Sequence, residues 1–295
     1  MKAKTVKNDL GNELAVAAVQ AGAPAGVQTM APAASAEARG TRRGASLDTA
    51  RLNAQLKAMY LTYVAQNFEA LGQQAAREQS SHVDYLAQLI DGEHGRRDDR
   101  GTERRVMAAR FPVLKTLEQF DWSWPTNVNQ MQIRHLFRLG FLKDKGNVIF
   151  IGTVGLGKTH LATALAHTAC LAGHSALFTT AINIINSLAA AQASGSMKRE
   201  MQKFLKPTIL VIDELGYLPI DKFGADCLFQ IVSARYEQRS TIVTSNRAFQ
   251  QWPEIFNNDS AITAALLDRL LHHAETVLIE GRSHRMKDQI ENLKA

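Results

Sequence analysis

The sequence has little cysteine and no long apolar run. Its 295 residues include only two cysteines, Cys170 and Cys227, and each falls in an apolar stretch with helical spacing. Two cysteines cannot form a disulfide framework, so we expect buried free thiols in a cytoplasmic protein. No stretch approaches the roughly 18 consecutive apolar residues that a membrane-spanning helix requires, so we predict neither a membrane span nor a membrane partner.

Aromatic residues are missing from the first part of the chain. Residues 1–46 contain thirteen alanines and no Phe, Tyr or Trp. A segment of this composition cannot bury enough apolar surface to offset the entropy that it loses on ordering. The sequence therefore predicts a disordered, Ala-rich tail over residues 1–46.

Residues 47–111 have the periodicity of helices. Apolar side chains recur at helical spacing over 52–71 and again over 83–90. Ser81 and Asp84 stand three residues apart before the second run, which is a capping signal. We expect a small α-helical N-terminal domain over 47–111 that serves interaction with a partner or DNA.

A charged third helix is expected over residues 93–110. It carries six arginines, namely Arg96, Arg97, Arg100, Arg104, Arg105 and Arg110. The net charge of +6 favours a polyanionic partner, nucleic acid first. These arginines either face DNA or lie on a solvated helix balanced by neighbouring acids, and we favour the solvated helix. Pro112 disfavours helix at the residue before it and marks the domain boundary.

Strand-like and helix-like segments alternate over residues 112–295. Apolar, β-branched runs predict strands at 147–151, 176–180, 208–212, 241–245 and 276–280. Helical patterns lie at 127–139, 158–172, 181–193, 198–205, 223–237 and 261–272. Five short buried strands separated by helices indicate an α/β fold with a parallel sheet covered on both faces.

A glycine-rich motif follows the first of these strands. It matches G-x-x-x-x-G-K-[ST] without a mismatch and consists of Gly152, Thr153, Val154, Gly155, Leu156, Gly157, Lys158 and Thr159. Its glycines let backbone N–H groups turn toward phosphates at a helix N-terminus. Lys158 would reach the β- and γ-phosphates of ATP, and the Thr159 hydroxyl would bind Mg²⁺. His160 is counted with the motif as a nucleotide-binding candidate, and we do not expect it to bind a metal.

Two adjacent acids end the third strand. Asp213 and Glu214 follow the apolar run 209–212, at the sheet edge where doubly wound folds bind ligands. Asp213 would hold Mg²⁺, directly or through water, and Glu214 is suited to deprotonate an attacking water.

Three further polar residues lie close to the fourth and fifth strands. Asn246 ends the fourth strand, where its amide could polarise water near the γ-phosphate. Arg269 lies on an apolar helix and is either a finger into a neighbouring subunit's site or a solvated or intrahelically paired charge. Arg285 follows the last strand and could contact phosphates. Trp122 and Trp124 either wall an adenine pocket or anchor the start of the domain, and we favour anchoring.

Residues 120–287 resemble the AAA+ ATPases of the IstB type, the helper proteins of insertion-sequence transposition, whose nearest kin is the helicase loader DnaC. The matching pieces read GTVGLGKTH, ILVIDELGYLP, STIVTSNRAF, AALLDRLLHH and EGRSHRMK. The helical N-terminal segment resembles the same family more loosely. The resemblance implies an αβα sandwich with strand order 5-1-4-3-2. Only fourteen residues follow Gly281, too few for a separate lid domain, which agrees with the DnaC/IstB branch.

The resemblance also implies roles for single residues. In the family's pattern Glu214 is the catalytic glutamate, Asn246 the first sensor, Arg269 a finger acting in trans and Arg285 the second sensor. The second of the two helices before the third strand carries basic residues, namely Lys198, Arg199, Lys203 and Lys206. An extra helix at this place resembles the initiator-type branch, which implies DNA contact; the alternative is a solvated helix face.

The resulting hypothesis is a Mg²⁺-dependent ATPase that assembles on DNA as an ATP-dependent homo-oligomer. By resemblance it assists a transposase, which it engages through the N-terminal domain, and it binds duplex DNA without sequence preference. A replicative helicase loader of the DnaC type is the first alternative, because it shares every catalytic residue. An ATP-gated DNA scaffold with little turnover is the second, and Glu214 argues against it because a scaffold needs no general base.

Overall fold

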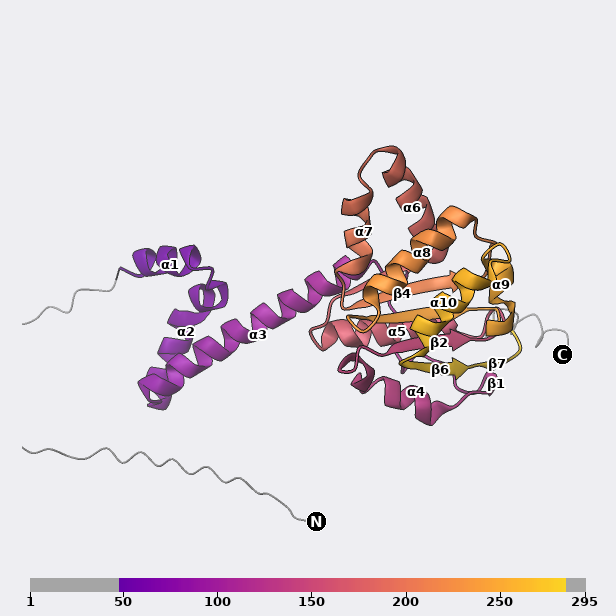
Figure 1. Cartoon of the computed structure of the whole chain (residues 1–295). Coiled ribbons are helices and arrows are strands. Elements are labelled where there is room, and N and C mark those ends of the chain that lie inside the picture. Colours follow the sequence, from indigo (N-terminus) through magenta and orange to yellow (C-terminus); the bar gives the residue numbers. More distant parts are fainter. Residues whose placement is uncertain (1–47, 285–295) are drawn as a thin grey trace, which may run out of the picture. The chain divides into compact units, whose positions relative to one another are not determined.

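Five parallel strands form the central sheet of the structure (Figure 1). The computed structural model describes residues 48–284. The strands are β2 (Asn147–Ile151), β3 (Ala176–Thr180), β4 (Ile209–Leu215), β5 (Ser240–Ser245) and β6 (Ala274–Leu278). Their order is β3-β4-β5-β2-β6, which is 5-1-4-3-2 when the five are numbered along the chain and read from the β6 edge. The predicted fold and strand order are confirmed.

Alternate residues of each strand enter two separate apolar cores. In β2, Val148 and Phe150 pack into the core on one face, and Ile149 and Ile151 pack into the core on the other. All five residues of β2 are buried. Burying a side chain of this size contributes about 1.5–3 kcal/mol, so continuous apolar strands are stable only when helices cover both faces.

Helices cover both faces of the sheet (Figure 1). On one face α5 (Lys158–Leu171) supplies apolar side chains to the core. On the other, the core takes residues from α6 (Ala181–Ala193), α8 (Lys222–Arg235) and α10 (Ser260–Leu271). The remaining helices of this region are α4 (Gln130–Leu136), α7 (Met197–Leu205) and the short α9 (Trp252–Ile255).

Several predicted bounds differ from the structure. The helix expected over 127–139 is α4 followed by a 3₁₀ turn, Gly140–Leu142. Strand β4 runs through Leu215, past the predicted end at residue 212. The last predicted strand begins at Ala274 instead of residue 276 and ends at Leu278. The sequence does not predict the two-stranded antiparallel pair of β1 (Pro125–Asn127) with β7 (Glu280–Gly281), because strands this short carry no periodicity.

Three helices precede the sheet region. They are α1 (Thr49–Ala58), α2 (Thr62–Glu78) and α3 (His82–Ala109). The Ser81 hydroxyl and the Asp84 carboxylate form the predicted capping box at the start of α3. The separate third helix expected over 93–110 is wrong, because α3 continues unbroken for 28 residues. The helix accommodates Gly92 because the Tyr63 ring fills the space there: a Cβ on Gly92 would lie 2.0 Å from Tyr63 Cε1.

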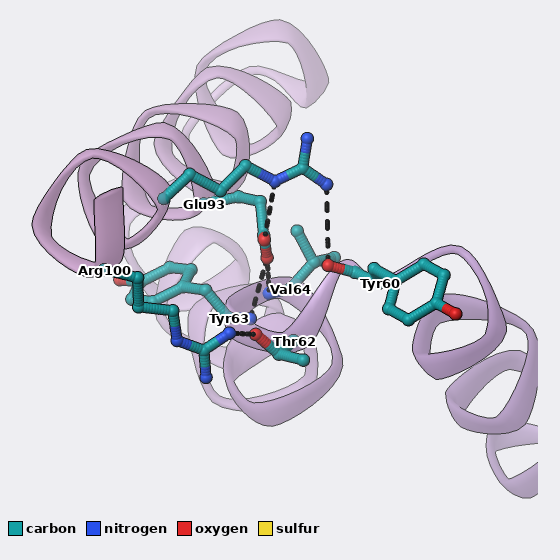
Figure 2. Close-up of polar contacts among 7 residues, drawn as sticks. Tyr60, Thr62, Tyr63, Val64, Glu93 and Arg100 are labelled. Carbon is teal, nitrogen blue, oxygen red and sulfur yellow. Dashed lines mark hydrogen bonds and ion pairs between the residues drawn. The ribbon is translucent and has the colours of Figure 1, made fainter. Parts of the chain in front are cut away.

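A buried carboxylate joins α2 to α3 (Figure 2). Glu93 is 4% exposed, and its Oε2 accepts from the backbone N–H groups of Tyr63 (2.7 Å) and Val64 (3.3 Å) at the start of α2. Arg97 Nε lies 3.2 Å from Glu93 Oε1, and Arg100 donates to the Thr62 hydroxyl. Burial raises the pKa of Glu93, but the two backbone donors and Arg97 together outweigh it and lower the pKa below its ordinary value. We call residues 62–100 the helical hairpin.

The arginines of α3 make contacts within the chain. Arg96 donates to Gln66, and Arg105 Nε donates to the Cys170 carbonyl at 2.9 Å. Ala109 near the end of α3 is fully buried in the core beside α5. Four of the six arginines, Arg97 and Arg100 included, therefore hold helices in place and are not simply solvated charges.

One buried arginine stabilises the amino end of the sheet. Arg235 is 1% exposed, and its guanidinium donates to backbone carbonyls of α7 and of the segments that open β4 and β5. The acceptors are the carbonyls of Phe204 (2.8 Å), Leu205 (3.5 Å), Pro207 (3.0 Å), Thr208 (3.3 Å) and Ser240 (2.5 Å). Burial, with a smaller contribution from Arg239, lowers the pKa of Arg235 to about 9.

The described helices and strands from Ala50 onward belong to one compact unit. The tail expected over residues 1–46 lies outside the described residues, and the domain boundary at residue 111 stays a prediction. Within residues 48–284 no helix is both long enough and apolar enough to span a membrane. Cys170 and Cys227 are buried free thiols, as predicted, and burial raises the pKa of both.

Candidate nucleotide site

The glycine-rich loop connects β2 to α5 at the carboxyl edge of the sheet. Gly155 and Gly157 have φ of +81° and +85°, a backbone conformation that glycine adopts without strain. A Cβ on Gly157 would also lie 2.6 Å from Phe120 Cε2, and one on Gly155 would lie 2.1 Å from Ser283 Oγ. The two glycines are therefore required by the conformation and by the close packing of neighbouring segments. Lys158 Nζ donates to the Thr153 carbonyl at 2.7 Å, so it folds back over the loop.

Asp213 lies beside the first turn of α5. It is 4% exposed, and the Thr159 hydroxyl donates to its two oxygens at 3.0 and 3.1 Å. The Thr244 hydroxyl, from β5, donates to the same carboxylate. The predicted pair of Thr159 and Asp213 is thus in direct contact. A buried carboxylate beside a hydroxyl is an all-oxygen donor set, which fits Mg²⁺.

Glu214 differs from its neighbour in backbone and exposure. Its φ is +59°, and the pairing of β4 with β5 shifts register between Ile212 and Leu215. Its N–H donates to Thr244 Oγ1 at 3.0 Å, which holds this unusual conformation. The result is that Asp213 is buried while Glu214, the next residue, is exposed and lines the cavity.

Asn246 contributes an unsatisfied acceptor. Its Oδ1 is buried and has no hydrogen-bond partner among the described residues. A buried polar atom without a partner costs about 1–3 kcal/mol, so this oxygen is suited to accept from a ligand or water in the cavity. Asn246, Thr244 and Glu214 line the same cavity as the glycine-rich loop.

The cavity has a volume of about 550 Å³. Its lining includes the loop residues Val154, Gly155, Leu156, Gly157, Lys158, Thr159 and His160. Gly152 and Thr153 complete the loop but do not line the cavity. The rest of the lining includes Phe120, Asp121 and Trp124, from the segment before β1, and His284, whose backbone N–H donates to the Gly155 carbonyl of the loop at 2.9 Å. Sequence reasoning misses Phe120, Thr244 and His284; the signal that could have found Thr244 is its place at the end of the fourth strand, two residues before Asn246.

Trp122 and Trp124 have different surroundings. Trp124 lines the cavity, and its indole N–H donates to the Arg282 carbonyl at 2.7 Å. Trp122 is not among the lining residues; it packs edge-on against Phe120 and under Arg134. Trp122 therefore fits the predicted role of anchoring the start of the domain, whereas Trp124 forms part of the cavity wall.

His160 joins the cavity wall to α5. Its Nε2 lies 2.8 Å from the Thr116 carbonyl, and its ring packs edge-on against Phe120. Burial lowers the pKa of His160, which favours the neutral ring with Nε2 as the donor. His160 thus holds the segment that walls the cavity.

Arg269 is away from the cavity within its own chain. Its guanidinium lies 4.9 Å from the centre of the Phe229 ring, and Nη1 donates to the Ala265 carbonyl at 2.8 Å. It is not among the residues that line the cavity. Arg285 lies outside the described residues.

The basic residues of α7 do not line the nucleotide cavity either. Lys198, Arg199 and Lys206 are exposed, and Lys203 pairs with Glu200 at 2.6 Å. Lys203 and Lys206 border a second cavity of about 720 Å³ between α7 and the outer edge of β3.

The comparisons with known proteins agree with this geometry. The family model described as IstB-like ATP binding protein matches residues 54–292. The chain is 38% identical to the ATP-binding protein of insertion sequence IS21 from Pseudomonas aeruginosa, over 81% of this chain and 88% of that one. It is 34% identical to the corresponding IS5376 protein from Geobacillus stearothermophilus, over 81% of this chain and 95% of that one.

Solved structures give a more distant likeness. The chain is similar to DnaI with 20% identity and a TM-score of 0.49, over 61% of this chain and 93% of that one. It is also similar to the DnaC helicase loader with 24% identity and a TM-score of 0.45, over 56% of this chain and 96% of that one. On the family match and the identity to the insertion-sequence proteins, the chain belongs to the IstB-like ATP-binding proteins of IS21-type insertion sequences.

Proposed function

We propose that the protein hydrolyses ATP with Mg²⁺ and uses the nucleotide cycle to assist a transposase on DNA. One observation supports ATP hydrolysis. Five polar residues from α5, β4 and the end of β5 lie together beside a complete phosphate-binding loop: Thr159, Asp213, Glu214, Thr244 and Asn246. A site that only bound nucleotide would not need an exposed carboxylate in a left-handed conformation at this place.

The loop and its lysine bind the phosphates. Inward N–H groups at the start of α5 hold the phosphate oxygens, and Lys158 leaves the Thr153 carbonyl to contact the β- and γ-phosphates. Thr159 and Asp213 would hold Mg²⁺, which would supply positive charge beside the phosphates. Thr244 keeps Asp213 oriented toward Thr159 through its hydroxyl.

Glu214 accepts a proton from the attacking water. The water oxygen forms a bond to the γ-phosphorus, the bond from that phosphorus to the bridging oxygen breaks, and ADP leaves with that oxygen. Asn246 Oδ1, unpaired among the described residues, accepts a hydrogen bond from the same water and fixes its direction. Arg269 of a neighbouring copy stabilises the charge that develops, since within its own chain it does not line the cavity. By the resemblance, Arg285, which lies outside the described residues, would contact the phosphates from the same chain.

The experiment that tests hydrolysis compares Glu214→Gln with Lys158→Ala. We expect Glu214→Gln to bind ATP normally and to hydrolyse it about 10²–10⁴ times more slowly. Lys158→Ala should lose ATP binding itself. Asp226→Asn removes an exposed acid of α8 outside the cavity and is the matched control. Turnover by Glu214→Gln close to that of Asp226→Asn would refute the role of Glu214.

DNA binding and transposase assistance are supported by the family and by the exposed basic residues of α7. The relatives are proteins of insertion sequences, so their genetic setting is transposition. Lys198, Arg199 and Lys206 are exposed on or beside one short helix and would contact phosphates without reading bases. ATP would join copies into a homo-oligomer on duplex DNA, with each site completed by the next copy, and the helical N-terminal segment would engage the transposase.

DNA binding is tested with the double variant Lys198→Glu with Arg199→Glu. We expect weaker binding to duplex DNA and a shallower salt dependence, with the slope reduced by about one unit for each phosphate that the variant no longer neutralises. Lys143→Glu changes an exposed lysine elsewhere and is the control. A preference for single strands would favour the helicase-loader alternative, and unchanged binding by the double variant would exclude α7 as the DNA surface.

A further inference from the structure

Two histidines and a glutamate meet at the edge of the sheet opposite the nucleotide cavity. Glu237 follows α8, and His272 and His273 follow the last residues of α10. The next elements are β5, which begins at Ser240, and β6, which begins at Ala274. Because β2, β5 and β6 are parallel, the cluster lies at the amino edge of the sheet, whereas the glycine-rich loop leaves the carboxyl edge. This cluster is therefore separate from the proposed Mg²⁺ site.

The three side chains converge on one point. His272 Nδ1 lies 3.8 Å and His273 Nε2 lies 3.7 Å from the same carboxylate oxygen, Glu237 Oε1. One ligand atom from each residue lies within 4.8 Å of the other two. Across the described residues, no other group of three His, Cys, Asp or Glu side chains converges in this way.

The three residues lie at the ends of two helices, and their side chains are about half exposed. Glu237 has φ of +55°, the left-handed conformation, directly after α8 ends. His272 is the last-turn cap of α10, and the two imidazole rings stand 4.1 Å apart at their centres, tilted by 46°. Solvated ion pairs contribute less than about 1 kcal/mol, so the carboxylate alone gives little reason for two adjacent imidazoles to face it, and of the two rings the Tyr236 hydroxyl contacts only that of His272. A divalent ion binds two neutral imidazoles and a carboxylate at once.

The chemistry of the donors selects the metal. Two imidazole nitrogens and one carboxylate oxygen suit zinc and neighbouring transition metals, whereas Mg²⁺ and Ca²⁺ prefer oxygen donors only. Bonds to Zn²⁺ of about 2.0–2.2 Å require the three ligand atoms to lie closer together than they do here. Because the side chains are about half exposed, they can rotate to reach that geometry. Tyr236 Oη lies 2.6 Å from His272 Nδ1 and holds that ring in place without the ion; Zn²⁺ bound at Nδ1 would take the place of this hydrogen bond.

We propose that Glu237, His272 and His273 bind one Zn²⁺ ion, with the fourth position open to water. The ion would join the end of α8 to the end of α10, which also meet through apolar side chains, the Arg269–Phe229 contact and the Tyr236–His272 hydrogen bond. This proposal does not depend on ATP hydrolysis or DNA binding.

The test is Zn²⁺ titration of the metal-stripped full-length chain, produced without a polyhistidine tag. An excess of Mg²⁺ is present, so that Mg²⁺ and not Zn²⁺ fills the oxygen site at Asp213. We expect one Zn²⁺ per chain by calorimetry. His272→Ala and His273→Ala should each weaken the affinity at least tenfold, and Glu237→Gln should weaken it by a smaller factor.

The matched control is His94→Ala. His94 is an exposed histidine whose Nδ1 lies 3.1 Å from Asp98 Oδ2, so it offers a His–carboxylate pair but, within residues 48–284, no third ligand. This variant should bind Zn²⁺ as the unchanged chain does. Because Glu237 and both histidines are about half exposed, their variants should keep the unchanged tryptophan emission of the folded chain.

A second measurement follows the geometry of the bound ion. Co²⁺, titrated in place of Zn²⁺, should give the visible absorption of a four-coordinate site in the unchanged chain and lose it in His273→Ala. Zn²⁺ affinity that is the same in the double variant His272→Ala with His273→Ala as in the unchanged chain would overturn the proposal. So would the absence of a saturable site.

Discussion

The helical hairpin and the sheet are stabilised in different ways. In β2 and β5 every residue is buried, and the cores on the two faces are almost entirely apolar. In α2 only Val64 and Ala65 are buried, and the contact between α2 and α3 centres on the buried carboxylate of Glu93. Apolar burial is insensitive to pH and weakly sensitive to salt, whereas a buried carboxylate responds to pH. The two regions should therefore lose structure under different conditions.

The largest effect is expected in the sheet. Phe150→Ala removes a fully buried ring from the central part of β2 and should lower the free energy of unfolding by about 3–5 kcal/mol. Urea unfolding followed by tryptophan fluorescence measures it, since all three tryptophans, Trp122, Trp124 and Trp252, lie beyond the hairpin. Hydrogen exchange of the α2 amides serves as the second probe. If exchange of the hairpin amides in Phe150→Ala rose by the same factor as exchange of the sheet amides, the two regions would not differ in what stabilises them.

A smaller and more local effect is expected at Glu93. Glu93→Gln keeps the shape but removes the charge that accepts from two backbone N–H groups and Arg97. Removal of such a charge-assisted hydrogen bond costs about 1–3 kcal/mol. The α2 amides of Tyr63 and Val64 should exchange roughly tenfold faster, while the urea midpoint read by tryptophan stays the same. Glu69→Gln, an exposed acid of α2, is the control.

The pH dependence of the hairpin follows from the lowered pKa of Glu93. Because the folded state holds the carboxylate ionised more strongly than the unfolded state does, its stabilising contribution is complete above the ordinary carboxyl pKa of 4.5. It is lost as the pH falls through the lower, folded pKa. Circular dichroism against pH should show hairpin helix melting in this acid range, and Glu93→Gln should remove the dependence. If Glu93→Gln showed the same acid transition as the unchanged chain, protonation of other carboxylates would be its cause.

The smallest effect is expected for the partly solvated contact beside Glu93. Arg100→Ala removes the donor to the Thr62 hydroxyl, and Arg100 is exposed. Exposed contacts of this kind contribute about 0.2–1 kcal/mol. Exchange of the α2 amides should therefore change severalfold less than in Glu93→Gln. An equal effect of the two variants would mean that the arginine, and not the buried carboxylate, holds the hairpin.

The sheet was predictable from the sequence because its strands are continuous apolar runs between turn signals. The same holds for the glycine-rich loop, whose residues follow one another along the chain. The unbroken α3 was not predictable, because Gly92 and the charges after it indicate a break until Tyr63 is seen to fill the space at Gly92. A contact between residues 29 positions apart leaves no local pattern.

Some residues of the candidate site were likewise predictable from the sequence, and others were not. Lys158, Thr159 and Asp213 are found from motifs and lie together as expected, with Thr159 and Asp213 in contact. The exposure of Glu214 depends on a left-handed residue within a strand, which no propensity favours for glutamate. The cavity wall at Phe120 and Trp124 comes from a segment without periodicity, so only the folded chain places it.

Arg235 connects the end of α7 to the strands that lead to the nucleotide site. Its guanidinium holds carbonyls at the end of α7, before β4 and at the first residue of β5. Strands β4 and β5 run from that clamp to Asp213, Glu214, Thr244 and Asn246 at their far ends. A displacement at the end of α7 would therefore reach the cavity residues through these two strands. Moving the end of α7 away from Arg235 would break its buried hydrogen bonds to the Phe204 and Leu205 carbonyls.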